Sequence, residues 1–262
     1  MTITGTLALA GRRIVVTRPK EHAAQLAGLL RAEGAEVEVL PTVEIVALPS
    51  GAALREWTTG LDDYAFAIFV SRTAVREGLR QAGALLGARP WPPGLQWATV
   101  GQGTRRELEA RGCRPVLAPE GTADSEALLA LPALADVRGR RIALFRGEGG
   151  RTLIADTLVA RGARLTEIPC YRRALPADPG AFAAAWQAGP VDAVTVSSGE
   201  GLANLLALLQ QGGLPRDNLP FFLPHARVAA QAREAGVDRI VVAGTSDAQV
   251  RDALVAYFTS SR

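Results

Sequence analysis

An internal repeat is the feature that most constrains how this chain can fold. Residues 141–173 repeat the pattern of residues 13–44 at a constant offset of 128 (141 − 13). A repeat of this kind indicates two copies of one supersecondary unit, so it is identified before any other pattern is interpreted. The pairs at this offset are Arg13 with Arg141, Arg18 with Arg146, Gly34 with Gly162, and Pro41 with Pro169.

Each copy of this unit predicts a strand, a helix and a second strand. The short apolar runs 14–16 and 142–145 are typical of strands that are buried on both faces. Apolar residues then recur at helical spacing, and a glycine ends each helix because it adopts the left-handed conformation at little cost. Second strands are expected at 37–40 and 165–168, joined by right-handed crossovers.

A second unit is also present twice. Residues 65–79 resemble residues 193–206, with Ser71 aligned to Ser198 at an offset of 127 (198 − 71). The order of units is therefore A, B, A′, B′, and the alternation of strands and helices predicts an α/β fold with parallel sheets. The remaining parts of the second unit are 99–118 with 223–242, and closing helices at 122–128 and 245–254.

Composition is that of an ordinary globular protein. The chain has 262 residues, 48% hydrophobic and 21% charged, which allows two cores. Cys113 and Cys170 are too few for a disulfide framework or a metal site, and they favour the reducing cytoplasm. No apolar run approaches the ~20 residues that span a bilayer, and residues 1–11 resemble a short tail, not a secretory signal.

Arginine dominates the cations. The formal net charge is +3, and Lys20 is the only lysine. The guanidinium group grips carboxylates and phosphates at two points, so some arginines are candidates for an acidic ligand, although GC-rich codon usage explains the same bias. Nucleic acid is not expected as that ligand, because the arginines are spread along the chain and aromatic residues make up only 5%.

Two proline-flanked extended segments, 41–51 and 169–179, stand at equivalent points of the repeat. They are where the chain would cross between two domains, once out and once back. If the crossings lie there, an inner domain spans 47–170 and a discontinuous outer domain combines 1–44 with 174–262. Two sequential domains, AB and A′B′, fit the repeat equally well, because the repeated units are the same in either arrangement.

Several strand-to-helix turns carry groups that can hold an anion. After Thr17 and Arg18, Pro19 suits a first helical position, and free N–H groups at such a helix start favour anions. Ser71 also follows a predicted strand, although helix capping alone explains a serine there. The strand ends at Thr17, Ser71, Gly101 and Gly147 are expected along one rim, the usual binding edge of a parallel sheet.

Conventional catalytic motifs are missing from the sequence. The two histidines, His22 and His225, lie in different units with no cysteine or paired carboxylate at metal-ligand spacing. There is no Gly-x-Ser-x-Gly elbow, no phosphate-loop lysine, and only part of a dinucleotide fingerprint at Gly101. We therefore expect no metal, and a site that places an acidic molecule and makes one or two hydrogen bonds to it.

The order of these elements resembles the uroporphyrinogen-III synthase family over residues 13–254. No single motif is specific, but their order and spacing together are. The resemblance implies two similar parallel-sheet α/β domains joined by a two-stranded crossover, with the inner and outer domains given above. The matching motifs are Thr17-Arg18-Pro19, Ser71 with Ala74-Val75, Val100-Gly101 with Thr104, Arg146-Gly147-Glu148 with Arg151, Tyr171-Arg172, and Ser198 with Gly201-Leu202.

The resemblance also implies a reaction. Enzymes of this family close hydroxymethylbilane, a linear tetrapyrrole rich in carboxylates, to uroporphyrinogen III with its last ring inverted. Water leaves the terminal hydroxymethyl group to give an azafulvene, the substituted carbon of ring D attacks, and the spiro intermediate fragments and recloses. No metal or organic cofactor is implied. The protein has to assist the departing hydroxyl and hold the chain in a productive curl.

The family's functional residues transfer onto particular positions of this chain. Tyr171 matches the family's tyrosine at the crossover and is expected to donate its phenolic proton to the departing oxygen, although a tyrosine packed at a domain junction gives the same pattern. A monomer in transient contact with hydroxymethylbilane synthase is expected. The expected substrate-binding residues are Thr17, Arg18, Ser71, Gly101, Thr104, Arg146, Gly147, Ser197, Ser198, His225 and Arg227.

One segment departs from the family pattern. Where the family has glycine, proline and threonine before the last helix, this chain has His225-Ala226-Arg227-Val228, and valine cannot form a side-chain hydrogen bond. Either His225 and Arg227 take over a carboxylate contact, or the chain is an impaired or repurposed relative. The alternative function is a non-catalytic tetrapyrrole- or carboxylate-binding regulator on the same scaffold, which would bind its ligand without turnover.

Overall fold

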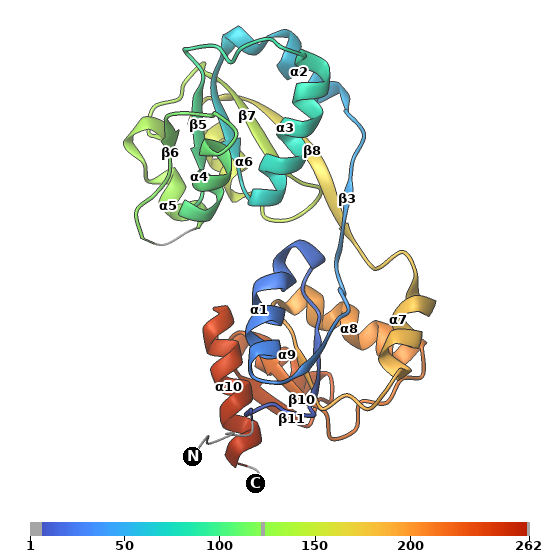
Figure 1. The fold of residues 1–262 in the computed structure, drawn as a ribbon. Helices are drawn as coiled ribbons and strands as arrows, with labels where there is room; N and C mark the ends of the chain where they lie inside the picture. The colour runs from blue at the N-terminus through green and yellow to red at the C-terminus, as the bar shows by residue number, and fades with distance from the viewer. Residues whose placement is uncertain (1–6, 122–123, 261–262) are drawn as a thin grey trace, which may run out of the picture. The chain divides into compact units, whose positions relative to one another are not determined.

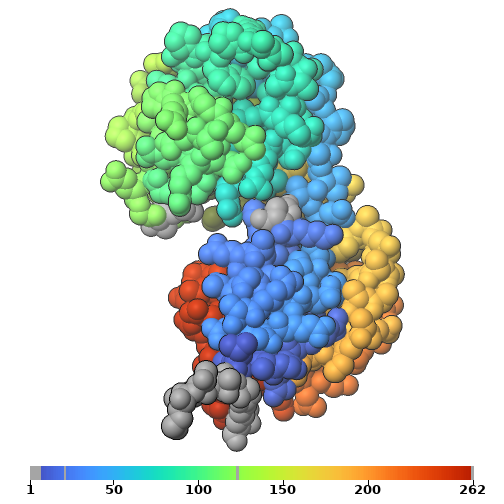
Figure 2. All heavy atoms as spheres, viewed as in Figure 1, coloured from blue at the N-terminus to red at the C-terminus, as the bar shows by residue number. Residues whose placement is uncertain are grey.

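The computed structural model describes residues 7–121 and 124–260, and it divides into two compact units. The outer unit contains the described residues up to Glu44 and from Ala174 onward, and the inner unit is Ile45–Arg173. Figure 1 follows the chain from blue to red, and Figure 2 shows blue atoms against orange and red ones within the outer unit. The outer unit is therefore assembled from both ends of the chain.

A five-stranded parallel sheet forms the centre of the outer unit, in the order β11-β10-β9-β1-β2. Val16 of β1 lies opposite Thr195 of β9, so strands from the two ends of the chain run side by side. The strands are β1 (Arg13–Val16), β2 (Glu36–Val39), β9 (Ala193–Thr195), β10 (Pro220–Leu223) and β11 (Arg239–Val242). The helices are α1 (Lys20–Ala32), α7 (Pro179–Gln187), α8 (Gly199–Gln211), α9 (Ala226–Glu234) and α10 (Asp247–Ser260).

A six-stranded sheet forms the centre of the inner unit, in the order β3-β8-β7-β4-β5-β6. The pairs from β8 to β6 are parallel, and beyond β3 the N–H of Leu48 donates to the carbonyl oxygen of Cys170 (3.1 Å). The strands are β3 (Glu44–Ala47), β4 (Tyr64–Phe69), β5 (Gln96–Thr99), β6 (Val116–Leu117), β7 (Arg141–Gly147) and β8 (Arg164–Ala174). The helices are α2 (Ala52–Thr59), α3 (Arg72–Leu86), α4 (Gln102–Glu109), α5 (Ser125–Leu129) and α6 (Leu153–Ala160), with 3-10 turns at Leu61–Asp63 and Pro132–Leu134.

Helices cover both faces of each sheet. Alternate residues of a strand point to opposite sides of the sheet, and the residues on each side pack against a different set of helices. In the outer unit, Val15 packs with α7, α8 and α9, whereas Val16 packs with α1 and α10, which lie beside each other in Figure 1. In the inner unit, Phe145 packs with α2, α3 and α4, and Leu144 packs with α5 and α6. Each unit therefore has three layers, with helices on either side of one sheet.

The two sheets have the same strand order once the repeat is applied. β1 and β2 correspond to β7 and β8, and β9, β10 and β11 correspond to β4, β5 and β6. Gly34 and Gly162 follow α1 and α6 with φ angles of 90° and 83°, the left-handed conformation that the sequence predicted. The predicted fold class, two similar α/β units with parallel sheets, is confirmed.

The start of the chain differs from the sequence prediction. Residues 7–11 do not form a tail, because Leu9 is fully buried in the core beneath α1 and α10 and its N–H donates to the carbonyl oxygen of Glu33 (2.9 Å). Residues 1–6 of the predicted tail lie outside the described residues. Pro19 is the N-cap residue of α1, one position before the first helical residue.

Two later segments also differ from expectation. The extended segment predicted at 169–179 continues as β8 only to Ala174, and the unpredicted helix α7 begins at its end. Asp178 initiates α7 by accepting a hydrogen bond from the N–H of Ala181 (2.8 Å), with a proline at the first helical position. Of the closing helix predicted at 122–128, α5 begins at Ser125, and residues 122–123 lie outside the described residues.

Candidate functional site

Candidate residues gather at the carboxyl edge of each sheet. In the inner unit, Ser71, Gly101 and Gly147 lie at the ends of β4, β5 and β7, which are neighbouring parallel strands. Thr17 follows β1 and belongs to the outer sheet, because β1 pairs with β9 and β2. The expectation that four strand ends share one rim is therefore correct for three of them and wrong for Thr17.

Tyr171 projects from β8 onto this inner edge. Arg146 lies opposite Pro169 but Gly147 lies opposite Tyr171, so β8 contains one extra residue, Cys170, at a bulge. A bulge changes the direction of the following side chain. The tyrosine is only 3% exposed, and a Cβ atom placed on Gly147 would lie 2.8 Å from its Cζ. The ring therefore packs directly on the backbone of Gly147, where only a glycine fits.

Ser71 links the phenol of Tyr171 to helix α3. Its Oγ lies 3.1 Å from the phenolic oxygen of Tyr171, and it also accepts a hydrogen bond from the N–H of Ala74 (3.0 Å). A hydroxyl can accept one hydrogen bond while it donates another. Ser71 therefore caps α3, as capping statistics suggest, and in addition contacts the candidate proton donor.

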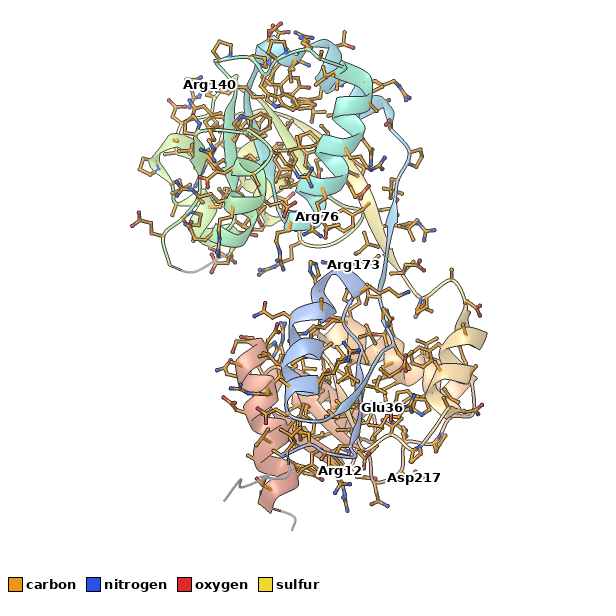
Figure 3. All side chains as sticks on the ribbon, viewed as in Figure 1. Arg12, Glu36, Arg76, Arg140, Arg173 and Asp217 are labelled. Atoms are coloured by element: carbon orange, nitrogen blue, oxygen red, sulfur yellow. The ribbon has the colours of Figure 1, made fainter. Side chains whose placement is uncertain are left out.

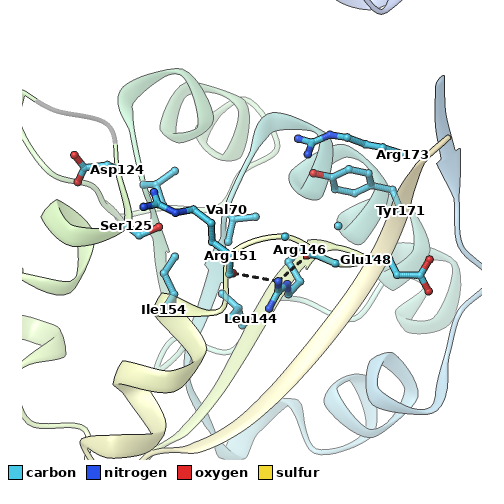
Figure 4. Close-up of a pocket in the computed structure, with 14 residues that line it drawn as sticks. Val70, Asp124, Ser125, Leu144, Arg146, Glu148, Arg151, Ile154, Tyr171 and Arg173 are labelled. Carbon is cyan, nitrogen blue, oxygen red and sulfur yellow. Dashed lines mark hydrogen bonds between the residues drawn. The ribbon is translucent and has the colours of Figure 1, made fainter. Parts of the chain in front are cut away.

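A pocket of about 300 Å³ opens beside Tyr171 within the inner unit. Figure 4 shows Tyr171 and Arg173 extending from the same side of β8, as residues two apart on a strand do. The pocket is lined by Val70, Val100, Asp124, Ser125, Leu144, Arg146, Gly147, Glu148, Gly149, Gly150, Arg151, Ile154, Tyr171 and Arg173. Sequence reasoning missed Arg173, which its spacing from Tyr171 could have indicated. Ser71, Gly101 and Thr104 are outside this lining, and the latter two are buried.

Arg146 is already engaged by groups of its own unit. Its guanidinium donates to Oε2 of Glu167 (2.6 Å) and to the carbonyl oxygens of Gly149 (2.7 Å) and Arg151 (3.1 Å). The two carbonyl contacts are the dashed lines in Figure 4. Although Arg146 lines the pocket, these contacts hold its guanidinium group against the pocket lining.

The outer unit has an equivalent edge at the ends of β10, β9 and β1. Two candidate substrate-binding residues at this edge, Thr17 and Arg18, already bond to other residues of the outer unit. The hydroxyl of Thr17, which is 3% exposed, donates to the carbonyl oxygen of Thr195 (2.8 Å). Arg18 forms an ion pair with Asp247 at the start of α10, and both side chains are largely buried. Thr17 and Arg18 therefore serve the structure of the outer unit.

Two serines at the outer edge are exposed. Ser198 caps α8 by accepting a hydrogen bond from the N–H of Gly201 (3.0 Å), which is the same arrangement as Ser71 in the inner unit. Ser197 precedes it and is also exposed. Hydroxyl groups and free N–H groups at a helix start are suited to carboxylates.

The segment that departs from the family pattern begins helix α9. His225 is its N-cap residue without a side-chain cap, and His225 and Arg227 are exposed. Val228 is 1% exposed and packs in the core with α7 and α8. The valine therefore fills the core, and the polar side chains exposed at this helix start are the histidine and the arginine.

The thiol of Cys170 and the carboxyl group of Glu107, both in the inner unit, have shifted pKa values. Burial raises the pKa of the Cys170 thiol to about 12, so it stays protonated beside Tyr171. Burial alone would raise the pKa of Glu107, but hydrogen bonds from Arg76 (Figure 3) and Arg111 outweigh it and hold that pKa below its ordinary value. Among the described residues, no group of three or more His, Cys, Asp or Glu side chains is arranged to hold a metal ion.

Comparison with known proteins identifies the family. The sequence model of the family described as uroporphyrinogen-III synthase HemD matches residues 24–250. The chain belongs to the uroporphyrinogen-III synthase family. It is 34% identical over 237 residues to the Escherichia coli uroporphyrinogen-III synthase, a match that covers 89% of this chain and 96% of that protein. The Salmonella typhimurium synthase is also 34% identical, over 242 residues and the same shares of both chains.

Solved structures of synthases share the fold of this family member. The Helicobacter pylori uroporphyrinogen-III synthetase matches with a TM-score of 0.61 and 12% identity, and the match covers 96% of this chain and all of that one. A mutant Thermus thermophilus uroporphyrinogen III synthase matches with a TM-score of 0.60 and 20% identity over the same shares. Within the part of the chain that the structure describes, no helix is long and apolar enough to cross a membrane.

Proposed function

We propose that this chain catalyses the closure of hydroxymethylbilane to uroporphyrinogen III with loss of water. Membership of the family supports the reaction, and one observation within the chain supports it most: the phenol of Tyr171 lies on the pocket, 3.1 Å from the hydroxyl of Ser71. The inner sheet thus presents a phenolic proton donor at its carboxyl edge, with a hydrogen-bond partner for the oxygen that remains after the proton has left. This is the arrangement that departure of a hydroxyl group needs.

In this proposal, Tyr171 acts as the general acid. Its O–H bond breaks as the C–O bond of the hydroxymethyl group breaks, and the proton leaves with the oxygen as water. The electron-rich pyrrole stabilises the cationic carbon that remains. The hydroxyl of Ser71 then donates a hydrogen bond to the phenolate and still accepts one from the N–H of Ala74. The positive amino end of α3 thereby stabilises the negative charge on the phenolate oxygen. The proton released at the final ring closure restores the phenol.

The carboxylates of the substrate are proposed to meet polar groups at the two sheet edges. In the inner unit these are Ser71, Thr104 and the backbone at Gly101 and Gly147; in the outer unit they are Thr17, Arg18, Ser197, Ser198, His225 and Arg227. The strongest support is for the exposed serines, His225 and Arg227. The weakest is for Thr17 and Arg18, whose side chains already bond Thr195 and Asp247.

We also propose that the protein works as a cytoplasmic monomer, without a cofactor, and contacts hydroxymethylbilane synthase transiently. The two thiols are buried and unpaired, which suits a reducing compartment. Transient contact is supported by the chemistry, since the substrate closes spontaneously to isomer I unless it reaches the second enzyme quickly. Size-exclusion chromatography at two concentrations, with and without hydroxymethylbilane synthase, tests the monomer and the contact.

The test of the activity is a coupled assay. Hydroxymethylbilane is made in place by its own synthase, this protein is added, and the products are oxidised and separated as uroporphyrins I and III. We expect isomer III to predominate over the isomer I of spontaneous closure. Isomer I alone from folded protein would reject the proposal, and ligand binding without turnover would point to a regulator.

A further inference from the structure

The segment 147–151, which begins at the last residue of β7 and which we call the loop 147–151, is rich in glycine and lines the pocket. Three of its four residues from 147 to 150 are glycines, and Gly149 and Gly150 have φ angles of 71° and 87°, in the left-handed region. Glycine loses more backbone freedom on ordering than other residues do. A loop of this composition adopts one conformation only if other groups hold it in place.

Arg146 is the group that holds this loop. One guanidinium nitrogen reaches the carbonyl oxygens of Gly149 (2.7 Å) and Arg151 (3.1 Å), and another reaches Glu167 on β8 (2.6 Å). The side chain of Arg146 is 12% exposed and that of Glu167 is 45% exposed, so the guanidinium is the more shielded member of this charge-assisted pair. Three of the five N–H donors of its guanidinium are used in this way, so the side chain is committed to the loop and to Glu167.

The position of the loop determines the position of Tyr171. The N–H of Glu148 donates to the carbonyl oxygen of Tyr171 (2.7 Å), and the backbone of Gly147 lies against the tyrosine ring. Movement of the loop would therefore remove the surface on which the ring rests. Small displacements of a reacting group matter, since about 1 Å of misplacement can cost ~100-fold in rate.

We propose that Arg146 and Glu167 are positioning residues for Tyr171, and that Arg146 is not a ligand of the substrate's carboxylates. The pair locks the loop 147–151, the loop supports the ring, and the ring presents its hydroxyl to the departing oxygen. The proposal rests on the proposed synthase activity for its kinetic consequences. Its structural consequence, an ordered loop, does not depend on that activity.

The kinetic test uses Arg146→Gln and Glu167→Gln with a control on the same strand. Arg141 begins β7 at its amino end and forms ion pairs with Glu56 (2.9 Å) and Asp63 (3.2 Å), so Arg141→Gln removes two ion pairs at the opposite edge of the sheet, one more than Arg146→Gln removes. We expect kcat to fall ~10- to 100-fold in both test variants, with KM within about twofold and more isomer I. The control should keep the kcat of the wild type.

A second measurement separates this proposal from the proposed function. Amide hydrogen exchange at Glu148 should become at least ~10-fold faster in Arg146→Gln while the amides of β7 keep their protection, because the loop opens locally. An unchanged exchange rate would overturn the proposal, as would a raised KM with unchanged kcat, which identifies a substrate ligand. If the wild type yields only isomer I, the proposed function fails, and the exchange experiment still decides whether Arg146 holds the loop.

Discussion

The two units have the same strand order but different groups at their carboxyl edges. With the offset of 128, Tyr171 of the inner unit corresponds to Val43 of the outer unit (171 − 128), and Gly147 corresponds to Pro19 (147 − 128). Val43 is 7% exposed and apolar, so the outer edge has no proton donor at this position. The scaffold therefore supplies two similar edges, and these two positions are where a phenol and the glycine beneath it are present in the inner unit but not in the outer one.

The contacts that hold the helices to the sheet occur at equivalent positions of both units, although the side chains that make them are not always the same. Ser71 and Ser198 cap α3 and α8 through bonds of equal length, 3.0 Å. The hydroxyl of Thr42 donates to the carbonyl oxygen of Gly201 (3.1 Å), and at the equivalent position the Cys170 thiol contacts the carbonyl oxygen of Ala74 (3.7 Å). Positions that support the helices have therefore kept their partners, whereas positions at the pocket have diverged.

Removal of the phenolic hydroxyl is expected to have the largest effect. Tyr171→Phe should lower kcat ~100- to 1,000-fold, because the departing hydroxyl loses its general acid. Tyr64→Phe is the matched control: Tyr64 is buried in the same unit and bonds Thr166 (2.8 Å). Steady-state kinetics of both variants make the comparison, and equal losses would mean that Tyr171 is only a packed tyrosine.

The next largest effect is expected from a methyl group at the glycine beneath the ring. Gly147→Ala places its Cβ 2.8 Å from Cζ of Tyr171, so the ring has to move, and we expect kcat to fall ~10- to 100-fold. Gly83→Ala on α3 meets nothing within 4 Å and should keep activity while stability rises by ~0.5–1 kcal/mol. Full activity of Gly147→Ala would show that the ring position is not critical.

Loss of the Ser71 cap should lower kcat more than loss of a helix cap away from the pocket. Ser71→Ala removes the bond to Ala74 and the contact with Tyr171, so we expect stability to fall by ~1 kcal/mol and kcat to fall several-fold. Asp178→Ala removes the cap of α7 and should cost similar stability without loss of kcat. Urea unfolding and kinetics together test this, and equal kcat values for the two variants would contradict it.

Arg18 and Arg146 occupy equivalent positions of the repeat, and we expect Arg18 to stabilise the fold of the outer unit, whereas Arg146 holds the loop 147–151. Arg18→Gln leaves Asp247 largely buried without its partner, so the free energy of unfolding should fall by ~1–3 kcal/mol. The double variant with Asp247→Asn should recover part of this loss. Urea unfolding of the three variants measures the coupling; unchanged stability with a raised KM would instead identify Arg18 as a substrate ligand.

The smallest effect concerns the two thiols of the inner unit. Burial raises the pKa of Cys113 and Cys170 from 9.0 to about 12, so the folded protein should resist thiol-alkylating reagents at pH 8. The native state retains protons that the unfolded chain releases above pH 9, so this contribution to stability is lost as pH rises from 9 toward 12. Fast alkylation of folded protein at pH 8 would contradict the buried placement.

Much of the fold was predictable because the repeat and its periodicity are local signals. Strand-helix-strand order, the glycine stops and the capping role of Ser71 follow from short stretches of sequence. The burial of Leu9 and the start of α7 depend on packing and on a single cap at Asp178, which hydrophobic periodicity does not report.

The candidate site was less predictable than the fold. Family resemblance selected Tyr171, but its contact with Gly147 depends on a bulge at Cys170 that no sequence pattern marks. The internal ion pairs of Arg18 and Arg146 are also long-range, so spacing could not distinguish bound arginines from available ones. Which residues contact the substrate stays a prediction.

The most direct test of the account is the isomer ratio from freshly made hydroxymethylbilane, measured for the wild type and Tyr171→Phe in one experiment. The account predicts that the wild type gives mainly isomer III and that the variant gives mainly isomer I at the spontaneous rate. Isomer III from both proteins would contradict the role of Tyr171. Isomer I from both would contradict the proposed activity itself.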